Sequence, residues 1–350
     1  MARIMRMPAE WEPHAATWLA WPHEKSDWPG KFAPIPWLYG EIVARLARVE
    51  RVRILCQDPA AVRRVLTKCH ADLNAVDLLE FATDRSWTRD TCAIFVHGDR
   101  NKLVATDWHF NGWAKYDNWR NDARAAAFLA RCLSIPSVEP TLAKRRIVLE
   151  GGSIDVNGCG ALLTTEECLL SDVQARNPGV TRKQMEKVFA RYLGIRKVLW
   201  LRNGIAGDDT HGHIDDIARF VNPSAVVIAC ESDPLNANFE PLRENLELLR
   251  EMTDQDGRQL SVYTLPMPRP VWFNGQQLPA SYANFYIANK LVLVPTFNDP
   301  NDRVALNVIA HLFPDREVVG IACTDLVLGL GTLHCMTQQE PACLIKRLLL

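Results

Sequence analysis

The chain has 350 residues, of which 48% are hydrophobic and 23% charged, and its formal net charge is -1. This composition is ordinary for a globular protein, and the length suffices for a large core in one or two domains. A net charge near zero excludes general attraction to nucleic acid or to an anionic membrane surface, so a charged ligand must be recognised locally.

The sequence shows no sign of export or membrane insertion. Its first residues are basic but lack the apolar stretch of a secretory signal, and no window approaches the length of a membrane span. The ten cysteines contain no Cys-x-x-Cys pair, which argues against a disulfide framework and against a structural zinc site. We therefore expect a cytoplasmic protein.

The proline and tryptophan content and the spacing of apolar residues predict the first elements of the chain. Residues 8–37 are rich in proline and tryptophan, and we expect irregular chain with aromatic anchors there. Apolar residues at helical spacing predict a helix over 37–50, followed by a strand at 51–56. Asp58-Pro59 is a typical helix start.

Further along, strands and helices continue to alternate, with a loop at 107–119 and a turn at 272–275. The helix at 181–192 has a threonine cap and ends before Gly194. We expect strands at 93–96, 161–165, 197–201, 219–222, 225–230 and 317–321, a hairpin within 282–295, and helices at 120–133, 181–192, 238–252 and 302–312. This alternation predicts an α/β fold.

Five polar constellations recur along the chain at similar intervals. Their markers follow one another by 60, 63, 69 and 52 positions and are Asp90, Glu150, His213, Tyr282 and His334. Such spacing is typical of a divergent internal repeat, although no sequence identity links the units. It predicts several similar modules whose loops point at one central site.

The last constellation contains the candidate nucleophile. Gly329 and Gly331 suit a tight loop that delivers the adjacent His334 and Cys335 to a pocket. The alternative is that Cys335 is a small buried hydrophobic residue, as free cysteines often are. The carboxylates and the histidine of the other constellations favour the nucleophile.

These side chains suit one kind of ligand. Asp90, Glu150 and Asp215 would repel one another unless a cation lay between them, and a guanidinium binds carboxylates through paired hydrogen bonds. A Cys335 thiolate could attack its central carbon, and His213 could protonate the departing ammonia and later activate water. In addition, Glu150 could orient His213, and Trp87 either stacks on the flat ligand or only packs in the core.

Two other functions fit some of these residues. The pattern of His211, His213, Asp215 and Asp216 resembles the start of a binuclear zinc site, but it lacks a histidine directly after the first aspartate; loss of activity in chelator would support it. A binding protein for guanidines would need the carboxylates and Trp87 but not the thiol. Product formation separates binding from catalysis.

Ordered motifs give the chain a family resemblance. It resembles an agmatine deiminase, or a close relative within the bacterial peptidylarginine-deiminase type of the guanidino-group-modifying superfamily. The motifs that carry the resemblance cover nearly the whole chain and are Met7-Pro-Ala-Glu-Trp-Glu-Pro-His, Trp87-x-Arg-Asp90, Asn111-Gly-Trp, Glu150-Gly-Gly-Ser-Ile-Asp, Thr165-Glu-Glu-Cys-Leu-Leu, Asp208-Asp-Thr-x-Gly-His-Ile-Asp215, Ser281-Tyr-Ala-Asn-Phe-Tyr-Ile, Pro295-Thr-Phe-x-Asp-Pro and His334-Cys335-x-Thr-Gln-Gln339.

The resemblance implies a fold and a reaction. The fold is the pentein α/β propeller, five pseudo-repeats around a central active site, in a single domain over 1–350. The implied reaction hydrolyses a guanidine to a ureido group plus ammonia without metal or cofactor. Agmatine, giving N-carbamoylputrescine for putrescine and polyamine synthesis, is the favoured substrate; free arginine and peptidyl arginine are the alternatives.

The resemblance also implies roles for individual residues. The nucleophile is Cys335, the acid/base is His213, the guanidinium clamp is Asp90 with Asp215, and the partner of the histidine is Glu150. Asp208 or Asp209 is implied to help the clamp or to hold the far end of the substrate.

Some positions depart from the family pattern. Family members commonly have Gly-Pro at Cys92-Ala93 and Gly-Gly-Gly-Asn where this chain has Gly329-Leu-Gly-Thr332, and the Asn-Gly-Trp loop lacks a usual glycine pair. These positions are expected near the pocket wall. These departures leave the identity of the substrate and the role of Cys92 undecided. The sequence also does not decide whether the protein is a homo-oligomer.

Overall fold

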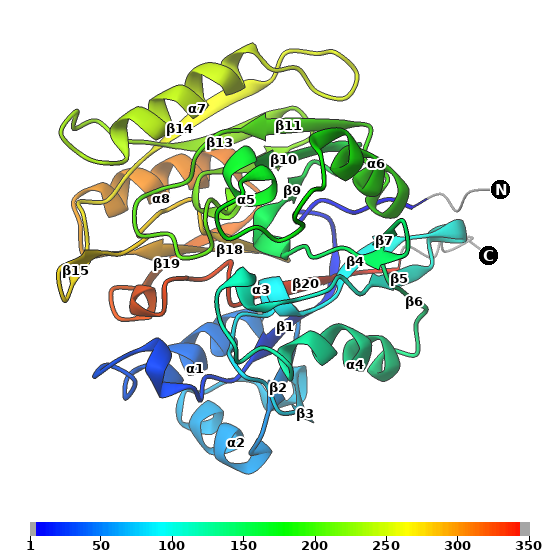
Figure 1. Cartoon of the computed structure of the whole chain (residues 1–350). Coiled ribbons are helices and arrows are strands. Elements are labelled where there is room, and N and C mark those ends of the chain that lie inside the picture. The colour runs from blue at the N-terminus through cyan, green and yellow to red at the C-terminus, as the bar shows by residue number, and fades with distance from the viewer. Residues whose placement is uncertain (1–4, 344–350) are drawn as a thin grey trace.

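One strand arrangement recurs in the computed structural model, which describes residues 5–343 (Figure 1). A central strand pairs antiparallel with the strand before it and parallel with the strand after it, and a helix makes the parallel crossover. The first such unit comprises β4 (Ile94–His97), β5 (Leu103–Thr106), α4 (Ala125–Cys132) and β6 (Ser137–Val138).

Three further units follow in chain order with the same pairing. They are β9 (Asp155–Val156), β10 (Ala161–Thr165), α6 (Arg182–Leu193) and β11 (Lys197–Leu201); β12 (Ala218–Asn222), β13 (Ala225–Cys230), α7 (Phe239–Glu251) and β14 (Ser261–Pro266); and β17 (Tyr286–Ala288), β18 (Leu291–Thr296), α8 (Asn301–Leu312) and β19 (Glu317–Ala322). Short hairpins join β7 (Thr141–Leu142) to β8 (Arg145–Arg146) and β15 (Trp272–Phe273) to β16 (Gln276–Gln277).

A fifth sheet joins segments from opposite ends of the sequence. β20 (Gln338–Pro341) pairs antiparallel with β1 (His14–Ala20), and β1 pairs parallel with β2 (Arg51–Cys56) after a crossover through α1 (Ile35–Leu46). β3 (Val76–Glu80) extends this sheet after α2 (Pro59–Lys68). Figure 1 shows blue β1 beside red β20.

The strand β1 corrects one prediction. Residues 8–37 were expected to be irregular throughout, but residues 14–20 form a strand between β2 and β20. The prolines at 13 and 22 flank this strand and none lies inside it, so its backbone can pair on both sides. Trp18 on this strand is completely buried.

The turn expected at 272–275 is shorter than predicted, because Trp272 and Phe273 form strand β15, while most other predicted elements agree with the structure. The strand at 51–56, the hairpin and the alternating helices are present, and the helix expected over 120–133 is confined to α4 after a single 3-10 turn. Gly194 ends α6 with a φ of 74°, the left-handed conformation that favours glycine. No helix within residues 5–343 is long and apolar enough to cross a membrane. The first four residues of the basic N-terminal segment lie outside the described residues.

Candidate active site

The candidate site is built from the segments that directly precede the first strand of each unit. These segments supply Asp90 before β4, Glu150 before β9, Asp215 before β12, Asn284 before β17 and Cys335 before β20. All five side chains are buried. The repeated topology therefore brings together the loops that the sequence spacing predicted would meet.

The thiol of Cys335 is held by an asparagine and a carboxylate. Asn284 Nδ2 donates to Cys335 Sγ at 3.1 Å and to Asp216 Oδ1 at 3.0 Å, and the thiol lies 3.6 Å from Asp215 Oδ2. Asn284 Oδ1 accepts from Thr332 Oγ1 at 2.7 Å. Asn284 thus fixes both the sulfur and the loop that carries it.

The motif Ser281-Tyr-Ala-Asn-Phe-Tyr-Ile, which contains Asn284, was identified from the sequence, but Asn284 was assigned no role. The presence of Asn284 in that motif could have marked it as a site residue. The marker residue of that segment, Tyr282, donates its hydroxyl to Asp302 Oδ1 at 2.7 Å. This bond ties the segment to the start of α8.

His213 lies between two carboxylates. Its Nδ1 is 3.9 Å from Asp90 Oδ2 and its Nε2 is 3.8 Å from Glu150 Oε2, and neither ring nitrogen has a hydrogen-bond partner. Burial alone would lower the pKa of His213, but Asp90, Cys168 and Glu150 together raise it well above its ordinary value. This shift favours the imidazolium form of His213, which can give up a proton.

Glu150 is anchored by a residue that sequence reasoning missed. Arg176 Nε donates to Glu150 Oε1 at 3.0 Å. Burial opposes ionisation of Glu150, but Arg176 and His213 outweigh it and lower the pKa of Glu150 to about 2. Arg176 follows α5 (Glu166–Leu170) in irregular chain, where no periodic pattern marks it.

The two predicted clamp carboxylates flank a glycine. Asp90 accepts from Gly152 N at 2.9 Å and from Trp113 Nε1 at 2.8 Å, while Asp215 Oδ1 is buried without a partner. A Cβ added to Gly152 would lie 2.6 Å from His213 Nδ1 and 3.0 Å from both Asp215 Oδ2 and Asp90 Oδ1. Only glycine leaves these three groups in place.

The surroundings of Cys335 favour the protonated form of its thiol in the ligand-free site. Burial raises the pKa of Cys335 well above its ordinary value, and the carboxyl groups of Asp215, Asp216 and Asp90 raise it further. A cation bound among these groups would oppose that shift and favour the thiolate.

A cavity of about 460 Å³ reaches Cys335 and Asp90, whereas His213, Glu150 and Asp215 are not among its lining residues. Its lining includes Cys335, Asp90, Trp87 and Asp209. Trp87 packs against the ring of Trp28 at 5.6 Å between centroids, so it serves the core as well as the cavity wall.

The two aspartates implied for the far end of the substrate lie in different places. Asp209 lines the cavity, and its carboxylate contacts the Lys115 ammonium and the Tyr116 hydroxyl. Asp208 is absent from the lining; it accepts from Gly212 N at 2.8 Å and from His213 N at 3.0 Å. Asp208 thus holds the backbone that carries His213, and a contact of either aspartate with substrate stays a prediction.

With this geometry in place, the chain can be compared with known proteins. Residues 6–341 match the family model described as Porphyromonas-type peptidyl-arginine deiminase. The chain belongs to this family. It is 33% identical to the agmatine deiminase of Pseudomonas aeruginosa strain LESB58 and 34% identical to that of Pseudomonas syringae pv. tomato, in each case over 96% of this chain and 95% of the relative.

Solved structures agree with this membership of the peptidyl-arginine deiminase family. The agmatine deiminase of Enterococcus faecalis superposes with a TM-score of 0.89 at 31% identity, covering 97% of this chain and 96% of that chain. A variant agmatine deiminase of C. jejuni with substrate bound gives 0.86 at 27% identity and covers 98% of both chains. The mixed α/β fold described above is the fold of these structures.

In this family member, the sequence pattern that resembled a zinc site is split. His211 Nδ1 lies 3.7 Å from Glu167 Oε1 and its Nε2 lies 3.3 Å from Ser171 Oγ, whereas His213 faces Asp90 and Glu150. In the part of the chain that the structure describes, no group of three close metal-ligating side chains contains His211. The structure therefore does not gather the pattern into one centre.

Proposed function

We propose that the protein is an agmatine deiminase that hydrolyses agmatine to N-carbamoylputrescine and ammonia. The observation that carries the proposal is the position of the buried Cys335 thiol. Its sulfur lies 3.6 Å from Asp215 Oδ2, and Cys335 lines the same cavity as Asp90. The relatives named agmatine deiminase align with almost the whole chain, which supports agmatine as the substrate.

In the proposed complex the guanidinium lies between Asp90 and Asp215. Both carboxylates are acceptors, and Asp215 Oδ1 has no protein donor, so an N–H of the ligand would satisfy it. The cation opposes the carboxylates that raise the pKa of Cys335, and the thiol proton passes to water as the ligand enters. Trp87 forms part of the wall beside the planar group.

The reaction then proceeds in two stages. The Cys335 thiolate attacks the guanidinium carbon, His213 protonates one amino group, and ammonia leaves a cationic S-alkylthiouronium. Neutral His213 next takes a proton from water, and hydroxide adds to the same carbon. The C–S bond breaks to return the thiolate, the proton of the added hydroxyl passes to water, and the neutral ureido product leaves. Glu150, fixed by Arg176, holds His213 during both proton transfers.

The fold supports this assignment. We propose that the five units, with β1, α1, β2 and β20 as one of them, are the pseudo-repeats of a pentein propeller in one domain over 1–350. Each unit contributes the segment before its first strand, as expected when repeated modules surround one site. We keep the cytoplasmic location as a prediction, with putrescine synthesis as the use of the product.

Ammonia release tests the proposed function. Agmatine, free arginine and an arginine-containing peptide are compared, each with and without chelator, using wild type and Cys335→Ala. We expect chelator-resistant release from agmatine that is absent in the variant. Ammonia release only from arginine or from the peptide would change the assigned substrate but leave the proposed mechanism intact. Loss of ammonia release in chelator would support a metallohydrolase.

A further inference from the structure

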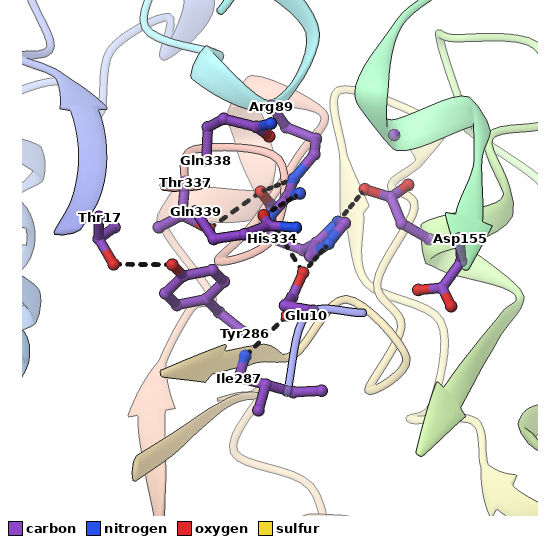
Figure 2. A network of polar contacts seen from close by, with 12 residues as sticks. Glu10, Thr17, Arg89, Asp155, Tyr286, Ile287, His334, Thr337, Gln338 and Gln339 are labelled. Carbon is purple, nitrogen blue, oxygen red and sulfur yellow. Dashed lines mark hydrogen bonds and ion pairs between the residues drawn. The ribbon is translucent and has the colours of Figure 1, made fainter. Parts of the chain in front are cut away.

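A buried glutamate beneath the site contacts several units. Glu10 precedes β1, and Figure 2 shows it at the centre of a network that the catalytic proposal does not use. Its carboxylate accepts from Ile287 N at 2.8 Å and from Arg89 Nη2 at 3.1 Å, and pairs with Arg219 Nη2 at 3.0 Å. These partners belong to the segments around β17, β4 and β12.

His334 connects this glutamate to the candidate site. Its Nε2 lies 2.8 Å from Glu10 Oε2 and its Nδ1 lies 2.7 Å from Asp215 Oδ2. The ring is therefore clamped between two carboxylates, one from the N-terminal segment and one from the site. His334 is also the residue that immediately precedes Cys335.

Both carboxylates that clamp the His334 ring accept hydrogen bonds from it. Burial would raise the pKa of Glu10, but Arg219, His334 and Arg89 outweigh it and hold that pKa well below its ordinary value. The pKa of Asp215 is also lowered, because His334, His213 and Arg219 together outweigh burial. Two ionised carboxylates both need a donor, and an imidazole donates from both nitrogens only as a cation.

Asp215 is the group on which His334 acts. Its Oδ2 is shared between His334 Nδ1 and the Cys335 thiol, whereas its Oδ1 has no partner. The bond from His334 therefore decides which oxygen of Asp215 remains without a protein donor. We propose that His334, braced by Glu10, is a positioning residue for deimination: it fixes Asp215 Oδ2 beside the sulfur and leaves Oδ1 to bind the guanidinium.

The inference rests on the proposed function, and paired variants test it. An asparagine amide reaches the position of Nδ1 and a glutamine amide that of Nε2, and both remove the charge. Because His334→Asn retains a donor to Asp215, its kcat/KM for agmatine should fall about tenfold, whereas His334→Gln should lose about 100-fold. A role limited to bracing Glu10 predicts the reverse order. Equal losses, or His334→Gln as the more active variant, would overturn the proposal.

The pH profile separates positioning from general damage. The titratable groups that face Asp215 are His334, His213 and Arg219, which lower its pKa, and Asp90, Asp216 and Cys335, each of which would oppose its ionisation when it carries a negative charge. Removing the His334 contact, which lowers the pKa of Asp215, should raise that pKa, so the acid limb of kcat/KM should move to higher pH in His334→Gln. If His334→Gln is folded and its acid limb of kcat/KM stays at the wild-type pH, the inference is contradicted.

One readout does not depend on turnover. Ring nitrogens of 15N-histidine-labelled wild type, assigned by comparison with His334→Gln, should both show a hydrogen bond to a carboxylate oxygen. A bare ring nitrogen would overturn the inference even if agmatine is hydrolysed. If the wild type releases no ammonia from agmatine, the proposed function fails, and the nitrogen signals still decide whether both ring nitrogens of His334 bond a carboxylate.

Discussion

Arg176 and Glu150 form an ion pair in which Nε and Oε1 lie 3.0 Å apart and both side chains are fully buried. This pair leaves Glu150 Oε2 free to face His213 at 3.8 Å. A buried charge that loses its partner is strongly destabilising, so the two residues must be altered together to separate stability from catalysis.

Glu150→Gln should change both stability and pH dependence. It leaves Arg176 buried and unpaired, which should cost about 3–5 kcal/mol. It also removes one of the groups that raise the pKa of His213, after Asp90 and Cys168. The pKa of His213 should therefore fall, and the alkaline limb of kcat/KM should move to lower pH.

The double variant Glu150→Gln with Arg176→Met supplies the control. It should regain much of the unfolding free energy, measured by denaturant titration, yet keep the shifted alkaline limb. A limb that returns to its wild-type position would contradict the role of Glu150 at His213.

Cys335→Ala should abolish turnover and retain guanidine binding, because the clamp carboxylates remain. His213→Ala should lose on the order of 10² to 10⁴ in rate as the acid/base is removed. Ammonia release and calorimetric titration with agmatine measure the two effects. Near-normal turnover by either variant would refute the covalent mechanism.

Gly152→Ala should impair catalysis with little effect on the rest of the molecule. Its Cβ would meet His213 Nδ1 at 2.6 Å, and displacement of a catalytic group by about 1 Å can cost on the order of 10²-fold in rate. Gly179→Ala is the control, because a Cβ there meets nothing within 4 Å, although its φ of +78° makes it mildly strained. Equal steady-state rates for both variants would contradict the steric argument.

Asn284→Ala should make the thiol less reactive. The hydrogen bond from Asn284 lowers the pKa of Cys335, against burial and three carboxyl groups that raise it. Its loss should move the pH profile of Cys335 alkylation by iodoacetamide to higher pH. The exposed Asn222 provides the matched control, and an identical profile for Asn222→Ala and Asn284→Ala would exclude the proposed contact.

Sequence patterns predicted those elements whose signal is local. The threonine cap and Gly194 bound α6, and the apolar run at 225–230 gave a buried strand, because capping and periodicity act over a few residues. β1 was obscured by the prolines on either side of it. β20 was not predicted, since its partner β1 lies more than 300 positions away and no local pattern records that pairing.

The same limit applies to the candidate site. Motifs pointed to Cys335, His213 and Asp90, whose side chains could do chemistry that is recognisable without a structure. They could not assign Arg176 or Glu10, because a buried ion pair depends on which loops meet after folding. Asn284 lay in a motif, but its amide contact with the sulfur is a tertiary feature.

The pairing of β1 with β20 ties the order of synthesis to catalytic competence. Cys335 and β20 emerge from the ribosome after the segments that carry the clamp carboxylates and the acid/base histidine. A chain terminated before them has no nucleophile, and it leaves one edge of β1 without its partner strand, which invites pairing with other chains. Premature termination therefore yields an aggregation-prone product in place of a weakly active enzyme.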